Sequence, residues 1–177
     1  IQYFFEQDLK YSYTAINTDD FSVSMLENYH TLVIPNGYYG GLFNKSKLDQ
    51  LSSWIRKGGK VIAIDGATSI FSNKKGFGLT SKSSDDKDED EAELINYEDL
   101  ERDRIQGSIT GAIFKTKIDN SHPLGFGYGD SYFTLKRGAR SYNYLENGYN
   151  VVRLENNTSF SGFVGNKASD SLEKSLI

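Results

Sequence analysis

The sequence predicts an α/β fold, because two apolar strand patterns flank one helical pattern and the second half of the chain is rich in further strand patterns. Residues 31–35 (TLVIP) and 60–64 (KVIAI) are short apolar runs, each followed by a turn, as is typical of buried strands. Two such strands joined by a helix indicate a parallel pair with a right-handed crossover. We therefore predict a βαβ unit at the centre of the fold.

The connecting helix is expected from its start, its apolar face and its end. Ser46 to Asp49 has the spacing of a capping box. Four apolar residues then recur on one helical face: Leu48, Leu51, Trp54 and Ile55. Gly58 and Gly59 follow, and glycine at this place supplies the left-handed residue that ends a helix.

Weaker patterns fill the rest of the chain. Before the βαβ unit we expect helix over 1–10 with Tyr3, Phe4, Phe5 and Leu9 apolar, an edge strand over 11–16, and a short helix over 19–28 with Phe21, Met25 and Leu26 inward. After it we expect helix over 94–104, a hairpin turn at 146–148, and strands over 108–118, 132–135, 149–154 and 160–164.

Size and composition limit the classes of protein. A chain of 177 residues is expected to form one domain over 1–177 that buries about 70% of its unfolded surface. The formal net charge of −4 gives no reason to expect a nucleic-acid partner. The absence of cysteine excludes disulfides, thiolate nucleophiles and cysteine zinc sites. No apolar run is long enough for a membrane span, and no signal peptide is visible.

An acidic segment and the two ends of the chain stand apart. Ser81 to Glu93 is expected to be a mobile insert, because it has too little apolar surface to offset its ordering entropy. Asp86, Asp88 and Asp90 have calcium-loop spacing, but Glu91 and Tyr97 stand where an EF-hand needs glycine and glutamate, so only loose cation binding remains open. Both ends start or stop within a pattern, and we interpret the chain as a piece of a longer protein.

Candidate ligand-binding residues follow the two predicted strands, because ligands of parallel sheets bind beyond the carboxyl ends of the strands. The turns there are 36–41 and 65–69, and neither contains a phosphate-binding motif. The candidates are Asn36, Gly37, Tyr38, Tyr39, Asp65 and Ser69. Tyr38 and Tyr39 suit packing or stacking on a ligand, and Asp65 is equally suited to capping the turn.

No catalytic or metal-binding set is apparent. Ser69 would need a base to act as a nucleophile, and no histidine lies near it in sequence. The two histidines, His30 and His122, lack the spacing of metal ligands, and His122 beside a proline is more often structural. We therefore expect no metal site, no cofactor and no catalysis by this chain on its own.

The order of several segments resembles a known family. Residues 29–37 (YHTLVIPNG) and 51–64 (LSSWIRKGGKVIAI) resemble the class I glutamine amidotransferase-like superfamily. Residues 111–114 (GAIF) and 122–128 (HPLGFGY) look like the amidotransferase-like domain that follows the catalytic domain in large bacterial zinc carboxypeptidases. This resemblance implies a flavodoxin-like sheet, with Asn36 and Gly37 at the oxyanion loop. It places Gly66 and Ala67 at the nucleophile elbow, where the expected cysteine is missing.

The resemblance implies a function for the chain as a part of a secreted, periplasmic or cell-surface zinc carboxypeptidase. The zinc and its ligands would belong to an upstream peptidase domain, and this domain would pack against it, regulate access to it, or bind a peptide or glycan. Two alternatives remain open at this point. One is a free-standing hydrolase that uses Ser69 or Asp65, and the other is a glycan- or cell-surface-binding module that uses Tyr38 and Tyr39.

Overall fold

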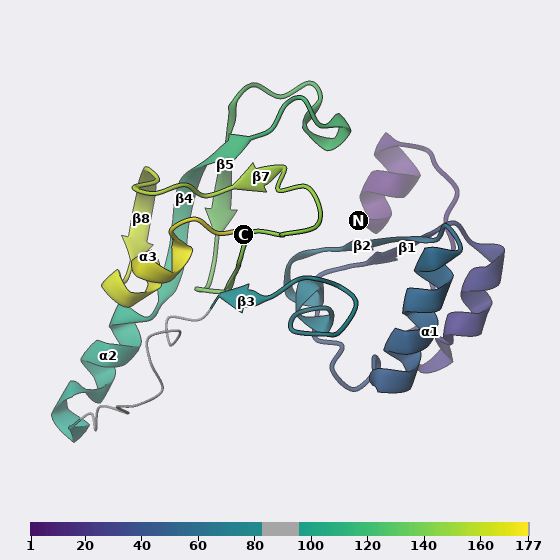
Figure 1. The fold of residues 1–177 in the computed structure, drawn as a ribbon, viewed down its shortest axis with the longest axis horizontal. Coiled ribbons are helices and arrows are strands. Elements are labelled where there is room, and N and C mark those ends of the chain that lie inside the picture. Colours follow the sequence, from purple (N-terminus) through teal and green to yellow (C-terminus); the bar gives the residue numbers. More distant parts are fainter. Residues whose placement is uncertain (83–95, 177) are drawn as a thin grey trace. The chain divides into compact units, whose positions relative to one another are not determined.

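The computed structural model describes residues 1–82 and 96–176, which divide into two compact units, Ile1–Ser72 and Asn73–Ile177. Both units combine helices with small sheets, so the predicted mixed α/β class is confirmed (Figure 1). One domain over 1–177 is expected from the sequence, whereas the structure forms two compact units that meet in the sequence at Ser72 and Asn73. Each unit is therefore described by itself.

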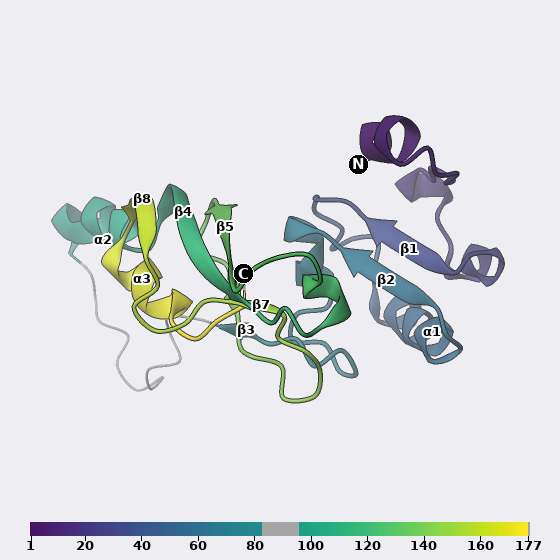
Figure 2. The ribbon, with the colours of Figure 1, turned by 90° about the horizontal axis from the view of Figure 1, so that it is seen from above.

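The first unit contains the predicted βαβ arrangement. Strands β1 (Thr31–Ile34) and β2 (Lys60–Ala63) are parallel, in a register that pairs Thr31 with Lys60 and Ile34 with Ala63. Helix α1 (Lys45–Arg56) connects them and lies along one side of the pair (Figure 2). Within the described residues no third strand joins this sheet, so its parallel part is smaller than expected.

The two strands are buried on one face only, which corrects the expectation of fully buried strands. Ile34 is buried, whereas Ile62 and Ile64 are 51% and 37% exposed. Alternate residues of a strand point to opposite faces of the sheet. One face is covered, and the face that carries Ile62 and Ile64 is partly open to solvent.

Helix α1 begins earlier than its sequence pattern indicates. Its N-cap is Asn44, whose side-chain oxygen accepts a hydrogen bond from the backbone N–H of Lys47 at 3.0 Å. The capping box predicted at Ser46 is therefore wrong, because Asn44 has the extended backbone of an N-cap and Ser46 is already helical. The predicted end is confirmed, since Gly58 has a φ of +105°.

The tryptophan of α1 fixes the helix to its neighbours. The Trp54 indole N–H donates to the carbonyl of Leu26 at 2.9 Å in a buried bond. A Cβ added at Gly59 would lie 2.4 Å from the Trp54 ring, so the chain leaves the helix directly against this side chain. Leu48 and Leu51 complete the buried face of α1.

The residues before β1 differ in part from the prediction. Short helical segments cover Phe4–Asp8, Thr18–Asp20 and Val23–Asn28, but 11–16 forms no strand. There the Tyr13 hydroxyl donates to Glu6 at 2.8 Å, which ties the segment to the first helix instead of to a sheet. In the third helix Val23 and Leu26 are buried, while Met25 is exposed.

The second unit is built on an antiparallel sheet. Strand β4 (Ile109–Ile118) pairs with β5 (Ser131–Lys136), with β7 (Val152–Arg153) and with β8 (Phe160–Val164). A separate small sheet pairs β3 (Ser81–Lys82) with β6 (Ser141–Tyr142). The predicted strands over 108–118, 132–135 and 160–164 are thus confirmed to within a residue or two, while β7 is shorter than the predicted 149–154.

One face of this sheet carries the core of the unit. Helix α3 (Asn166–Leu172) packs there, and an ion pair between Lys167 and Asp103 joins it to helix α2 (Leu100–Gln106). The core residues are Ile109, Ala112, Phe114, Leu154, Ala168 and Leu172. At the edge of β4, Gly162 of β8 approaches so closely that a Cβ there would lie 2.4 Å from the Gly111 carbonyl oxygen.

Three further predictions for the second half need correction. The strands on either side of 146–148 belong to different sheets, so this turn is not a hairpin; Asn150 closes the loop through two hydrogen bonds to Leu145, of 2.8 and 3.1 Å. The helix expected over 94–104 is divided, among the described residues, into a 3-10 helix at Tyr97–Asp99 and α2 from Leu100, and residues 94 and 95 lie outside the described part of the chain. Ser81 and Lys82, assigned to the insert, form β3 by pairing with β6. The rest of the insert, with Asp86, Asp88 and Asp90, lies outside the described residues.

We expect the Asn44→Ala variant to lower the free energy of unfolding of the first unit by about 1 kcal/mol, because the N-cap bond to Lys47 is lost. Chemical denaturation monitored by Trp54 fluorescence measures this loss. Ser46→Ala is the matched control and should have little effect. A larger effect of Ser46→Ala would show that the capping box is the true start of α1.

Candidate functional site

The turns that follow β1 and β2 contact each other, and we call residues 36–41 and 65–69 the turn pair. The Asn36 side-chain oxygen accepts a hydrogen bond from the Gly66 N–H at 3.0 Å. A Cβ added at Gly66 would lie 2.7 Å from this oxygen and 3.1 Å from the carbonyl oxygen of Gly37. Three residues from two separate turns are thus in direct contact at the carboxyl ends of the strands.

The two tyrosines of the turn pair fold back over its glycines. The Tyr39 hydroxyl donates to the Pro35 carbonyl at 3.1 Å, and its ring covers Gly37, where an added Cβ would lie 3.0 Å from a ring carbon. Tyr38 lies against Gly40 and is 91% exposed. Tyr39 therefore supports the turn, and Tyr38 presents its ring to solvent.

Asp65 has an unusual backbone for a residue with a side chain. Its φ is +51°, in the left-handed region, and it starts the short helix Asp65–Ile70 directly after β2. The Thr68 hydroxyl donates to the Asp65 carbonyl at 2.6 Å and so holds this conformation. The resemblance places the elbow at Gly66 and Ala67, whereas the left-handed residue of this turn is one position earlier. The carboxylate of Asp65 is exposed at this position.

Ser69 is already engaged in a local hydrogen bond. Its hydroxyl donates to the Gly66 carbonyl at 2.7 Å, within the same short helix. His30 precedes β1 and accepts a backbone hydrogen bond from Lys60 at the start of β2. This histidine, the one histidine of residues 1–72, thus lies at the opposite end of the strands from Ser69.

Backbone donors remain available on the first turn. No described residue accepts a hydrogen bond from the N–H groups of Gly37 or Tyr38. Such donors, next to each other on a turn, suit a carbonyl or carboxylate oxygen of a ligand. The turn pair therefore combines free N–H groups, an exposed aromatic ring and an exposed carboxylate.

The loop that follows β4 in the second unit explains the environment of His122. Its Nδ1 accepts a hydrogen bond from the Leu124 N–H at 3.2 Å, and its ring packs on Tyr149 with 4.7 Å between centroids.

In the same loop the carboxylate of Asp119 accepts hydrogen bonds from the hydroxyl and the N–H of Ser121, at 2.6 and 3.1 Å. These hydrogen bonds lower the pKa of Asp119, and the nearby charges of His122 and Arg153 lower it further.

The second unit also contains a polar hollow of about 410 Å³ that the sequence analysis did not single out. It lies over β4 between the start of β5 and the turn 155–159. Ten residues line it: Lys115, Thr116, Lys117, Asp130, Ser131, Glu155, Asn156, Asn157, Thr158 and Ser159. The only local sequence pattern that points to this hollow is KTK at 115–117, in which two lysines alternate along a strand. The other lining residues come from distant segments of the chain.

No group of three or more histidine, aspartate or glutamate side chains in the described parts of the chain is placed to hold a metal ion. Among residues 1–82 and 96–176 no helix has the length and apolar character needed to cross a bilayer.

Comparison of the chain with protein-family models, with curated proteins and with solved structures gave no significant match.

We expect Gly66→Ala to destabilise the first unit by about 1–3 kcal/mol, because the new methyl group overlaps the Asn36 side chain and the Gly37 carbonyl. Gly41→Ala is the matched control, since an added Cβ there meets no atom within 4 Å. Denaturation of both variants tests this. Equal stabilities would show that the two turns are not in contact.

The pKa of Asp119 should respond to Ser121. We expect an NMR titration of the Asp119 carboxyl carbon to give a midpoint below the usual 3.8, and Ser121→Ala to raise it. Because the folded pKa is lowered, the stabilisation from Asp119 is present above the unfolded pKa and is lost as the pH falls through the folded one. An unchanged midpoint in Ser121→Ala would contradict the role of the hydroxyl.

Proposed function

We propose that this chain is a non-catalytic accessory domain that binds a ligand at the turn pair. The observation that carries the proposal is the contact between the two turns, in which the Asn36 side chain accepts from Gly66 at 3.0 Å. This hydrogen bond occupies the side-chain oxygen of Asn36. The backbone N–H groups of Gly37 and Tyr38 are left as donors for a ligand. A site that has the hydrogen-bond donors of an oxyanion hole but no nucleophile binds a ligand oxygen without forming a covalent intermediate.

The chemistry of the turn pair favours a ligand with a carbonyl or carboxylate oxygen beside a flat apolar group. The two N–H groups suit the oxygen, and the exposed ring of Tyr38 suits stacking. A peptide or a glycan fragment can supply both. The alternative of a glycan- or cell-surface-binding module would use the same turn pair. It differs from the first proposal only in the ligand.

We further propose that this chain is a flavodoxin-like, amidotransferase-like domain of a longer protein. That protein would be a secreted, periplasmic or cell-surface zinc carboxypeptidase. The support is the βαβ unit with its turn pair, together with the resemblance of residues 29–37, 51–64, 111–114 and 122–128. The peptidase domain and its zinc would lie upstream in the same polypeptide. The complete coding sequence tests this, and an upstream HxxE motif with a distant histidine is the expected result.

A hydrolase that uses Asp65 is the second candidate, because one observation favours it. Asp65 has the left-handed backbone, at +51°, directly after a strand, which is where elbow nucleophiles stand, and carboxylates form covalent intermediates in some hydrolases. Ser69 is less suited, since its hydroxyl donates to Gly66. Release of an acyl-enzyme needs a base, and His30 is at the other end of the strands.

We expect the purified chain to show no esterase, amidase or peptidase turnover above buffer, and Asp65→Asn and Ser69→Ala to leave that result unchanged. Chromogenic ester and amide substrates provide the measurement. Titration of the ¹⁵N-labelled chain with a short peptide should shift the amide signals of Gly37, Tyr38 and Gly66. Turnover that Asp65→Asn or Ser69→Ala abolishes would establish the hydrolase and overturn the accessory role.

A further inference from the structure

We propose that the polar hollow of the second unit binds a sugar acid, that is, a small polyhydroxylated molecule that carries one carboxylate. The hollow lies over β4, between Ser131 at the start of β5 and the turn 155–159. It shares no residue with the turn pair. The proposal therefore does not depend on the function proposed for that site.

The lining of the hollow favours a ligand rich in hydrogen-bonding groups. All ten lining residues are polar or charged, and none has an aliphatic or aromatic side chain. Sites for drug-like ligands are instead lined mostly by apolar groups. An apolar group placed here would cover polar atoms without replacing their hydrogen bonds to water, which is unfavourable. Ligand hydroxyl groups replace those bonds.

Two lysines give the hollow its preference for an anion. Lys115 and Lys117 alternate along β4, so they lie on one face of the sheet about 7 Å apart along the strand. Within the described parts of the chain, neither is in an ion pair. Like charges side by side on a sheet repel each other. One carboxylate between the two ammonium groups relieves this repulsion.

The two carboxylates of the lining are held by other groups and limit the charge of the ligand. The Glu155 carboxylate pairs with the Arg153 guanidinium at 3.3 Å, and the Asp130 carboxylate accepts from the Asn120 amide at 3.0 Å. Their remaining oxygens accept hydrogen bonds from ligand hydroxyl groups. They also repel a doubly charged phosphate more than a carboxylate, which favours a sugar acid over a sugar phosphate.

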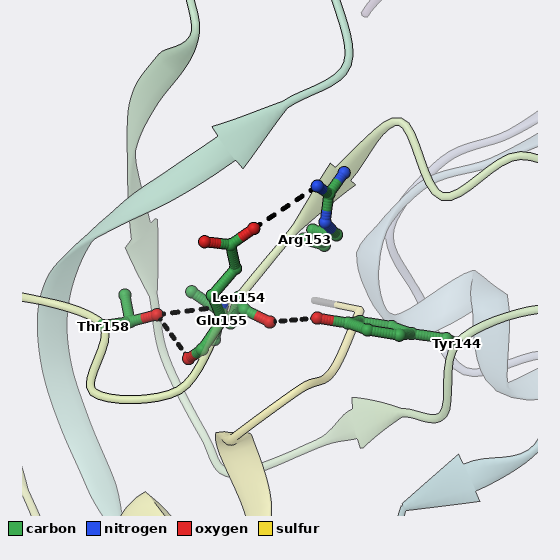
Figure 3. A network of polar contacts seen from close by, with 5 residues as sticks. All are labelled: Tyr144, Arg153, Leu154, Glu155 and Thr158. Atoms are coloured by element: carbon green, nitrogen blue, oxygen red, sulfur yellow. Dashed lines mark hydrogen bonds and ion pairs between the residues drawn. The ribbon is translucent and has the colours of Figure 1, made fainter.

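The turn that forms one wall is built before any ligand arrives. The Thr158 hydroxyl donates to the Glu155 carbonyl at 2.7 Å and accepts from the Glu155 N–H at 3.0 Å (Figure 3). The Tyr144 hydroxyl fixes the preceding residue through the Leu154 carbonyl at 2.5 Å (Figure 3).

The same turn presents side chains that have no other role in the fold. The amides of Asn156 and Asn157 form no hydrogen bond with a described residue, and Asn157 has a φ of +53°. The Lys115 N–H donates to the Ser159 carbonyl at 3.0 Å, which fixes the turn to β4. Because this wall is fixed in advance, little ordering opposes binding of a small ligand.

Titration of the ¹⁵N-labelled chain with glucuronate tests the proposal. We expect a dissociation constant on the order of 1 mM, because a polar site gains little from apolar burial. Amide shifts should be centred on 115–117 and 156–159. Glucose, acetate and glucose 6-phosphate are the comparison probes, and each should bind at least about tenfold more weakly, since each lacks the carboxylate, lacks the hydroxyl groups, or carries the second charge.

Variants separate the roles of charge and amide. The double variant Lys115→Gln/Lys117→Gln should weaken glucuronate binding at least about tenfold. Lys45→Gln, the same change in the first unit, should have no effect. Asn157→Gly removes an amide while keeping the left-handed backbone, so a weakening of a few fold with unchanged stability is expected.

Four outcomes would overturn the proposal. They are the absence of shifts at these amides, equal binding of glucose, equal binding of acetate, and equal or tighter binding of glucose 6-phosphate. Retention of the amide spectrum in the double variant shows that it is folded. In that folded variant, unchanged affinity for glucuronate would also overturn the proposal.

Discussion

Strand β4 is the element on which the second unit depends, because every other strand of the larger sheet pairs with it. β5 occupies one edge along six residues, whereas β8 and β7 divide the other edge between them. β8 ends its pairing at Phe114 and β7 begins at Lys117. The chain between β7 and β8 must turn within this interval, and the turn 155–159 does so. The polar hollow is therefore a direct result of two strands sharing one edge.

Both candidate sites are built from side chains that replace secondary-structure hydrogen bonds in a turn. In the first unit the Asn36 amide holds Gly66, and in the second the Thr158 hydroxyl holds both backbone groups of Glu155. Each turn is thus stabilised without a long stretch of regular structure. Left-handed backbone occurs in both, at Asp65 and at Asn157, and the polar side chains of these residue types tolerate it best.

The sequence correctly predicted the elements that depend on interactions between residues close to each other in the chain. The strand over 108–118, the glycine after α1 and the parallel β1–β2 pair were all predicted correctly. The start of α1 was wrong because Asn44 and Ser46 are both good caps, and only the backbone distinguishes them. Strands β3 and β6 have two residues each, too few for any period. The contact of Asn36 with Gly66 follows from strand order, but the hollow joins residues from three separate segments of the chain, which no short-range pattern reveals.

The half-covered sheet of the first unit affects how this protein behaves in concentrated solution. Among the described residues neither β1 nor β2 has an outer neighbour, and Ile62 and Ile64 expose apolar surface beside those free edges. Unpaired edges next to apolar side chains promote intermolecular strand pairing and aggregation. Lys60 at the start of β2 and Pro35 just after β1 oppose this as gatekeepers, one by charge and the other by its missing N–H. Replacing either residue would therefore impair solubility before it impaired folding.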